Sequence, residues 1–262
     1  MSVLHTEVEK TNDEGKIALM IYTIPNFPNP ETYQKTLEIL YQHPSVTLIE
    51  TTFPVSSKYS KYANQTIRSA HQQATEYVEG LTVLEELQAF NKPSICVLYQ
   101  ETFDALGFET ILRKLQGKID SVLFEWDVDD IAPYASLAKQ YEIELVQCTY
   151  PGITSAEMDK YIGLTGTKPL IYLVSAAMTG ADLCSDAELI ECIRQTKKHR
   201  PEAKMMAGFG IRNADDIRNL SRLEGLDGVI IGTAFLETMC QGVKAVEEFL
   251  DSIAPALNRV QH

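Results

Sequence analysis

The sequence has little positive charge, with 23 lysine and arginine residues against 36 aspartate and glutamate residues and a net charge of −13. A nucleic-acid partner is therefore not expected, because the chain offers no basic surface to replace the counterions of a phosphate backbone. An anionic small molecule would also meet net repulsion at long range. A pocket has to recognise such a molecule locally, through N–H groups and dipoles.

Cysteine motifs, targeting signals and long apolar runs are also missing. The five cysteines are odd in number and show no CxxC or Cys/His spacing of a zinc site, so we expect reduced thiols and no metal. The N-terminus is polar and acidic, whereas a secretory signal is basic and then apolar. No segment reaches the ~20 apolar residues of a membrane span. We therefore expect a cytoplasmic protein that does not contact a membrane.

The sequence does contain a regular alternation of strand-like and helix-like segments. Apolar runs typical of buried parallel strands occupy residues 17–24, 47–53, 94–99, 121–126, 144–149, 169–175, 204–207 and 228–231. Segments with apolar residues at three- and four-residue spacing lie between them, at 31–42, 66–90, 102–115, 128–140, 155–162, 185–199 and 213–223. An eighth helical pattern follows Gly232. Residues 54–65 are polar and irregular, which predicts a long loop.

This alternation of eight strands and eight helices predicts an α/β protein. We favour a (β/α)8 TIM barrel that spans residues 1–262 as a single domain. A doubly wound open sheet is the alternative. The barrel is favoured because no GxGxxG follows the first strand and because glycine turns follow the last two strands. We expect no cofactor.

The glycine turns, at Gly208/Gly210 and at Gly232, each lead toward a helical segment. Free N–H groups at the start of a helix, together with the positive end of its dipole, bind a phosphate without any lysine. In a (β/α)8 barrel the usual phosphate site lies after strands 7 and 8. The sequence therefore predicts a barrel enzyme that acts on a phosphorylated small-molecule substrate.

Glu50 interrupts a strand that otherwise consists of β-forming residues. A charged group in a barrel strand is costly unless it is paired or used, and burial would raise its pKa into the range of a general acid/base. A glutamate that points to solvent or pairs with a lysine is the competing interpretation. Other polar residues at the carboxyl ends of the predicted strands are Tyr22, Tyr99, Glu101, Glu125, Asp127, Thr149 and Tyr172.

Three histidines, His43, His71 and His199, lie in helical or helix-end segments and are expected at the surface. Trp126, the only tryptophan, is expected in the core or in a pocket wall. Three aspartates, Asp127, Asp129 and Asp130, are compatible with a magnesium site. Acidic residues in the first turn of a helix give the same sequence pattern.

Several ordered blocks resemble the motifs of one known family. ETTFPVS at 50–56 resembles Glu-Leu-Gly-Ile-Pro-Phe-Ser, and TIRSA at 66–70 fits the helix that follows. YLVSAAMTG at 172–180 resembles Tyr-Leu-Leu-Ser-Arg-x-Gly-Val-Thr-Gly. GFGI at 208–211 fits Gly-Phe-Gly-Ile, and GVIIGTA at 228–234 fits the final phosphate strand. By these blocks the chain resembles the tryptophan synthase alpha-subunit family.

The resemblance implies a (β/α)8 lyase that cleaves indole-3-glycerol phosphate to indole and glyceraldehyde 3-phosphate. It makes Glu50 the acid/base that moves a proton between C3 of the indole and the glycerol hydroxyl. The implied substrate-binding residues are Tyr22, Tyr99, Tyr172, Thr179 and Phe209, with Thr179 in a loop that closes over the site. The implied phosphate-binding residues are Gly180, Gly210, Gly232 and Thr233. A tryptophan synthase β-type subunit is a possible partner.

The sequence departs from this family at four places, one of which is the end of the third strand, where Tyr99-Gln-Glu replaces Tyr-x-Asn. The family has a second acid, an aspartate that holds the indole N–H, whereas the loop at 56–64 contains no carboxylate; Glu101, Glu125 or Asp127 would have to replace it. The closing loop is one residue shorter and has no arginine at 176–178. Residues 25–28, PNFP, replace the Gly-Asp-Pro that contacts the β-subunit.

Two other functions therefore stay open beside the lyase. The pocket could take a different phosphorylated substrate, on which Glu50 performs another proton transfer. The protein could also be a regulator without turnover that binds phosphate ligands or a β-type partner.

Overall fold

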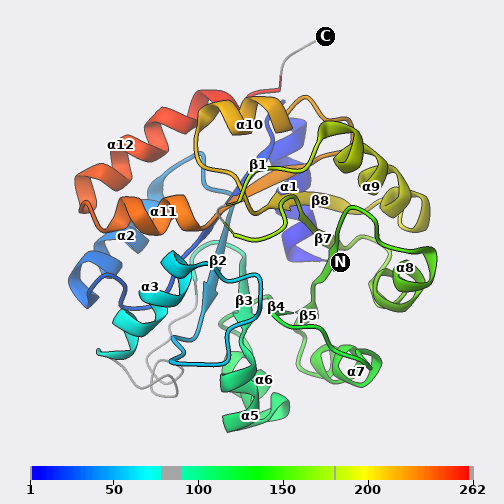
Figure 1. Ribbon diagram of the computed structural model, residues 1–262, viewed down its shortest axis with the longest axis horizontal. Coiled ribbons are helices and arrows are strands. Elements are labelled where there is room, and N and C mark those ends of the chain that lie inside the picture. Colours follow the sequence, from blue (N-terminus) through cyan, green and yellow to red (C-terminus); the bar gives the residue numbers. More distant parts are fainter. Residues whose placement is uncertain (1, 78–89, 180, 260–262) are drawn as a thin grey trace.

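The computed structural model describes residues 2–77, 90–179 and 181–259. Its strands form one sheet in the order β5-β4-β3-β2-β1-β9-β8-β7-β6, and every pairing is parallel. The strands are β1 (Ala18–Tyr22), β2 (Leu48–Thr52), β3 (Ser94–Leu98), β4 (Ser121–Phe124), β5 (Glu144–Leu145), β6 (Gln147–Thr149), β7 (Leu170–Val174), β8 (Lys204–Gly208) and β9 (Gly228–Ile231). Helices surround them (Figure 1), and the predicted (β/α)8 barrel is confirmed.

The predicted strand at 144–149 supplies both ends of this sheet. Val146 divides it into β5, which pairs with β4, and β6, which pairs with β7. The N–H of Val146 still donates to the carbonyl of Val122 (2.9 Å), so the chain leaves β4 and joins β7 within one residue. Because β5 and β6 together fill one strand position, the nine strands occupy the eight positions that the sequence predicts.

The helices alternate with the strands. They are α1 (Val3–Asp13), α2 (Pro30–Gln42), α3 (Gln65–Thr75), α5 (Gln100–Leu106), α6 (Phe108–Leu115), α7 (Ala132–Gln140), α8 (Ser155–Tyr161), α9 (Asp186–His199), α10 (Ala214–Leu220), α11 (Thr233–Met239) and α12 (Val243–Ile253), with 3-10 helices η1 (Ile162–Leu164) and η2 (Ala254–Leu257). Gly107, with a φ of 72°, divides the predicted helix at 102–115 into α5 and α6. The predicted helix at 66–90 begins as α3, and residues 78–89 lie outside the described ones.

Helix α1 is an element that the sequence patterns do not predict, because most of its residues are polar. Two of its three apolar residues, Leu4 and Val8, are fully buried, whereas Val3 is exposed. Near its end, Asn12 Nδ2 donates to the carbonyl of Asp227 (2.9 Å), the residue before β9. Helix α1 therefore packs at the amino ends of the strands and leaves their carboxyl ends free for a site.

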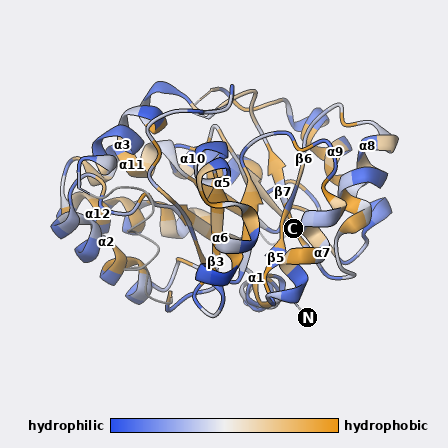
Figure 2. Cartoon of the chain, turned by 90° about the horizontal axis from the view of Figure 1, so that it is seen from below, coloured by the Kyte–Doolittle hydropathy of each residue, from blue (hydrophilic) through white to orange (hydrophobic). Residues whose placement is uncertain are grey.

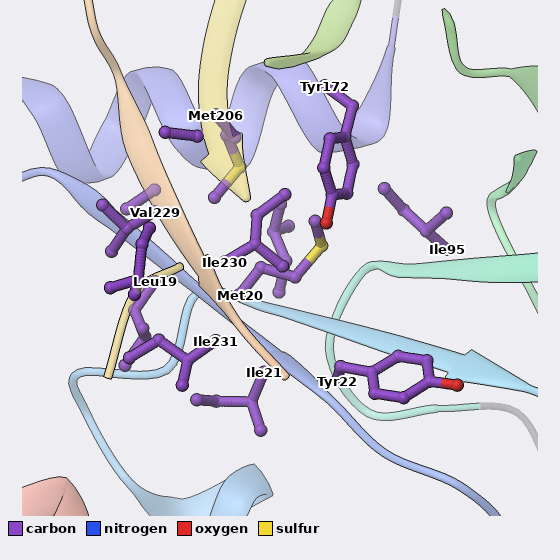
Figure 3. Close-up of a cluster of buried hydrophobic side chains, with 14 of the residues drawn as sticks. Leu19, Met20, Ile21, Tyr22, Ile95, Tyr172, Met206, Val229, Ile230 and Ile231 are labelled. Carbon is purple, nitrogen blue, oxygen red and sulfur yellow. The ribbon is translucent and has the colours of Figure 1, made fainter. Parts of the chain in front are cut away.

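Both faces of the barrel strands are buried. Figure 2 shows apolar strands in the middle of the molecule and helices whose outer surfaces are hydrophilic. In Figure 3, Met20 and Tyr172 lie on one side of β1, whereas Leu19 and Ile231 lie on the other, toward the helices. Since successive side chains of a strand point to opposite faces, double burial explains why β1 is apolar throughout.

Candidate active site

A cavity of about 920 Å³ opens at the carboxyl ends of the strands. It is lined by nine of the ten site residues that the sequence predicts, namely Tyr22, Glu50, Tyr99, Tyr172, Thr179, Phe209, Gly210, Gly232 and Thr233. The tenth, Gly180, lies outside the described residues. This end of a (β/α)8 barrel is where barrel enzymes bind their substrates, because the loops after the strands meet there.

Glu50 lies in the middle of β2. Its register partners on the two adjacent strands are Tyr22 of β1 and Ile95 of β3. Its side chain lines the cavity and is only 4% exposed. In the part of the chain that the structure describes, no hydrogen bond or ion pair reaches its carboxylate. Burial alone raises the pKa of Glu50 to about 8. The interpretation of Glu50 as a solvent-facing or lysine-paired residue is therefore wrong, and at neutral pH it carries a proton that it can donate.

His71 of α3 is fully buried, so the prediction that it lies at the surface is wrong. Its Nδ1 accepts the backbone N–H of Val55 (3.2 Å), which leaves the ring proton on Nε2. Nε2 then donates to the hydroxyl of Tyr22 (3.1 Å), and the Tyr22 hydroxyl is hydrogen-bonded to that of Tyr99. Burial lowers the pKa of His71 to about 3, so the ring is neutral and works as a fixed donor.

The other two histidines expected at the surface, His43 and His199, are partly exposed. Their rings lie 3.3 Å from carboxylate oxygens of Asp251 and Asp159, respectively. The signal that distinguishes His71 is its position on the buried face of α3, between Ile67 and Ala74. A residue four positions after one apolar residue and three before another lies on the same face of a helix.

The opposite wall of the cavity consists of aromatic rings. Tyr172 and Phe209 pack edge to face with ring centroids 6.0 Å apart. A Cβ at Gly208 would overlap the ring of Tyr172, so only glycine lets Tyr172 occupy this position. Phe209 itself has a φ of 78°, a backbone conformation that is unfavourable for an aromatic residue. The turn after β8 therefore carries strain at the point where it faces the cavity.

Two loops meet over the cavity. The hydroxyl of Thr179, in the loop after β7, donates to the carbonyl of Tyr62 and accepts the N–H of Asn64, both at 2.9 Å. Asn64 caps α3 through the N–H of Ile67 (2.9 Å) and also approaches the hydroxyl of Thr233 (3.5 Å). Thr179 thus connects the loop after β2 to the loop after β7.

The two helix starts expected to bind phosphate differ. At α10, the side chain of Asn213 accepts the N–H groups of Asp215 (2.9 Å) and Asp216 (3.1 Å), so these donors are already used. At α11, the N-cap is Gly232, and no side chain caps the helix. An anion in the cavity therefore finds free N–H groups at α11 and not at α10.

The three carboxylates considered as a second acid lie in different places. Glu101 bonds to the loop residues Ser56 and Ser57 outside the cavity. Asp127 lines the cavity but is exposed. Glu125 lines the cavity and is partly buried, and Ser60 donates to both of its oxygens. Trp126, beside Glu125, forms part of the cavity wall, as predicted.

The described residues contain neither a candidate metal centre nor a candidate membrane span. Over residues 2–77, 90–179 and 181–259, no group of three or more His, Cys, Asp or Glu side chains could hold a metal ion. All five cysteines are free thiols. None of the described helices is long and apolar enough to cross a membrane.

Fold and cavity together define a single-domain (β/α)8 barrel whose pocket, between the loops after its strands, is built around a buried carboxylate. The family model of the tryptophan synthase alpha chain matches residues 8–260. The chain belongs to this family.

Individual relatives agree with this assignment over almost the whole chain. The tryptophan synthase alpha chain of Caldicellulosiruptor bescii is 24% identical over 98% of this chain and 99% of its own length. That of Sulfurisphaera tokodaii is 27% identical over 84% of this chain and 88% of its own. Among solved structures, tryptophan synthase from M. tuberculosis superposes with a TM-score of 0.81 at 14% identity, with coverage of 98% of this chain and 100% of that chain. The alpha chain from Legionella pneumophila gives 0.80 at 18%, with coverage of 99% and 98%.

Proposed function

We propose that this protein is a carbon–carbon lyase that cleaves indole-3-glycerol phosphate to indole and glyceraldehyde 3-phosphate, with Glu50 as the general acid/base. Family membership supports the reaction class, and the observation that carries the assignment of Glu50 is its burial in the cavity without a partner. A neutral carboxylic acid beside bound substrate is a proton donor, and it becomes a base once it has given the proton away.

The reaction then runs in two proton transfers. Glu50 first protonates C3 of the indole, which breaks the aromaticity of the ring and leaves a positive charge shared with the ring nitrogen. Its carboxylate next takes the proton of the side-chain hydroxyl next to C3. The oxygen's electron pair forms the aldehyde, the carbon–carbon bond breaks, and its electrons return to the ring and neutralise the nitrogen. Glu50 ends protonated, as it began, so the cycle balances.

The remaining predicted residues position the substrate in this proposal. The rings of Tyr22, Tyr172 and Phe209 form walls of the cavity against which an indole can pack. The phosphate lies at the start of α11, near Gly210, Gly232 and Thr233, where uncapped N–H groups are available. Local N–H donors suit a chain with a net charge of −13, since the overall field repels the substrate.

The decisive experiment incubates purified protein with indole-3-glycerol phosphate and follows the release of indole. We expect turnover in the wild type and none above background for the Glu50→Gln variant. A wild type that releases no more indole than this variant excludes the lyase. Thermal unfolding with glycerol 3-phosphate then tests the phosphate site separately, because a pocket that binds the phosphate must raise the unfolding temperature.

A β-type partner belongs to the same proposal through the family resemblance. Residues 25–28 would face such a partner, and there Phe27 is buried while Asn26 has a φ of 63°. Size-exclusion chromatography with a tryptophan synthase β-subunit tests the association. A complex that elutes earlier than either protein alone supports it, and independent elution at micromolar concentrations excludes it.

A further inference from the structure

The cavity contains a second, partly buried carboxylate that has no part in the role proposed for Glu50. Glu125 directly follows β4 and lines the cavity, whereas Glu50 lies in β2. Three other acidic residues of the lining belong to helices: Glu188 and Glu237 are exposed, and Glu157 is partly exposed and bonded to Thr154 and Tyr150. Glu125 is thus the described carboxylate that shares the interior of the cavity with Glu50.

Glu125 is held in place by the loop after β2. The backbone N–H of Ser60 donates to one carboxylate oxygen of Glu125 (3.2 Å), and the Ser60 hydroxyl donates to the other. Arg68 Nη2 donates to the carbonyl of Ser60 (3.2 Å), which fixes the serine in turn. Each carboxylate oxygen has two lone pairs, so both can still accept a further hydrogen bond from a ligand.

We propose that Glu125 accepts a hydrogen bond from the indole N–H and stabilises the positive charge that forms on this nitrogen when Glu50 protonates C3. The inference rests on the proposed lyase function. It follows from the charge that the reaction creates: a cationic ring in a buried cavity needs an anion fixed in advance. Glu125 directly follows the end of β4, and Ser60, which orients it, lies 65 positions earlier in the sequence.

The electrostatic surroundings allow Glu125 to be an anion near neutral pH. Burial raises its pKa to about 7, while the two hydrogen bonds from Ser60 and the charge of Arg68 act in the opposite direction. Tyr22 of β1 and Tyr99, the residue after β3, face it as well, as neutral hydroxyls. Lys61, which also lines the cavity, lies over the ring of Tyr62 and faces Asp127.

Ligand binding tests this role without turnover. The probes are 3-(indol-3-yl)propyl phosphate, which lacks the hydroxyl needed for cleavage, and its N-methyl derivative, which lacks the N–H. Isothermal titration calorimetry should show the N–H probe binding at least about tenfold more tightly to the wild type, as a hydrogen bond to a charged group does. In a Glu125→Met variant, which has a similar volume but no acceptor, the two probes should differ by less than about twofold. An equal preference in both proteins overturns the proposal.

Turnover provides a second and separate test. Glu125→Gln keeps a similar shape but loses the charge, and kcat should fall on the order of 10²-fold with little change in KM. Asp129→Asn, an exposed residue of the same loop, removes the same charge outside the cavity and should retain activity. A Glu125→Gln enzyme as fast as the wild type refutes the proposal. A wild type without any indole release refutes the lyase function instead, and the calorimetric comparison still decides whether Glu125 binds the N–H.

Discussion

Replacing Glu50 by glutamine should abolish the proposed lyase activity and at the same time stabilise the fold, by an amount that grows with pH. Burial raises the pKa of Glu50 to about 8 from its ordinary 4.5. The unfolded carboxyl therefore releases its proton at lower pH than the folded one. The wild type loses stability as pH rises from 4.5 to 8, whereas glutamine, which resembles the protonated acid, cannot ionise.

The magnitude follows from the two pKa values. A difference of one pKa unit between the folded and unfolded states is worth about 1.4 kcal/mol. The cost of keeping Glu50 protonated is below about 1 kcal/mol at pH 5, about 3 kcal/mol at pH 7 and close to about 5 kcal/mol at pH 9. The advantage of the glutamine variant should therefore increase by about 4 kcal/mol between pH 5 and pH 9. This is a large part of the ~5–15 kcal/mol that stabilises a typical domain.

Urea unfolding of both proteins at pH 5, 7 and 9 measures this increase. Changes in the other charged groups affect wild type and variant alike, so they cancel in the difference. Glu38→Gln, on the exposed face of α2, is the matched control, because it removes a carboxylate that is not buried. If the advantage of Glu50→Gln is the same at pH 5 and pH 9, the folded pKa of Glu50 is ordinary. The assignment of Glu50 as a neutral proton donor then fails.

Three further predictions follow. In the indole-release assay, kcat/KM should rise through about pH 7 as Glu125 ionises and fall above about pH 8 as Glu50 does; a flat profile from pH 6 to pH 9 contradicts both roles. Tyr22→Phe removes the acceptor of the buried His71 N–H, so urea unfolding should show a loss of about 1–3 kcal/mol, and a loss below about 0.5 kcal/mol would mean that the bond does not matter. Gly208→Ala should displace Tyr172 and lower stability by about 1–3 kcal/mol in thermal unfolding; an unchanged midpoint would show that the ring can move freely.

The barrel could be predicted because its strands are short, apolar and separated by amphipathic helices, and both signals are local. The features that the sequence did not predict are those that depend on the whole fold. Helix α1 is polar over most of its length, and only the contacts of Leu4 and Val8 beneath the barrel reveal its buried side. The division of residues 144–149 into β5 and β6 depends on which neighbours the strand meets as the barrel closes.

The candidate site shows the same limit. Glu50 could be singled out because a charged residue inside an apolar strand conflicts with its surroundings. The lack of a partner for Glu50 could not be predicted, because the fold decides which lysines come near its carboxylate. The residue type of His71 favours the surface, but its spacing from Ile67 places it on the apolar face of α3, where it is buried. Position in the helical pattern was the better guide.

Glu125 illustrates how the fold turns an open choice into a specific arrangement. Glu101, Glu125 and Asp127 are equivalent in sequence, as carboxylates near strand ends, but only Glu125 is both inside the cavity and held by Ser60. Burial raises the pKa of both carboxyl groups, but only at Glu125 do the hydrogen bonds from Ser60 and the charge of Arg68 lower it again, so Glu125 gives up its proton more readily than Glu50. Two carboxyl groups whose surroundings separate their pKa values can take opposite roles. The cavity therefore offers a proton donor and a fixed anion together near neutral pH, which is the combination that protonating an indole ring requires.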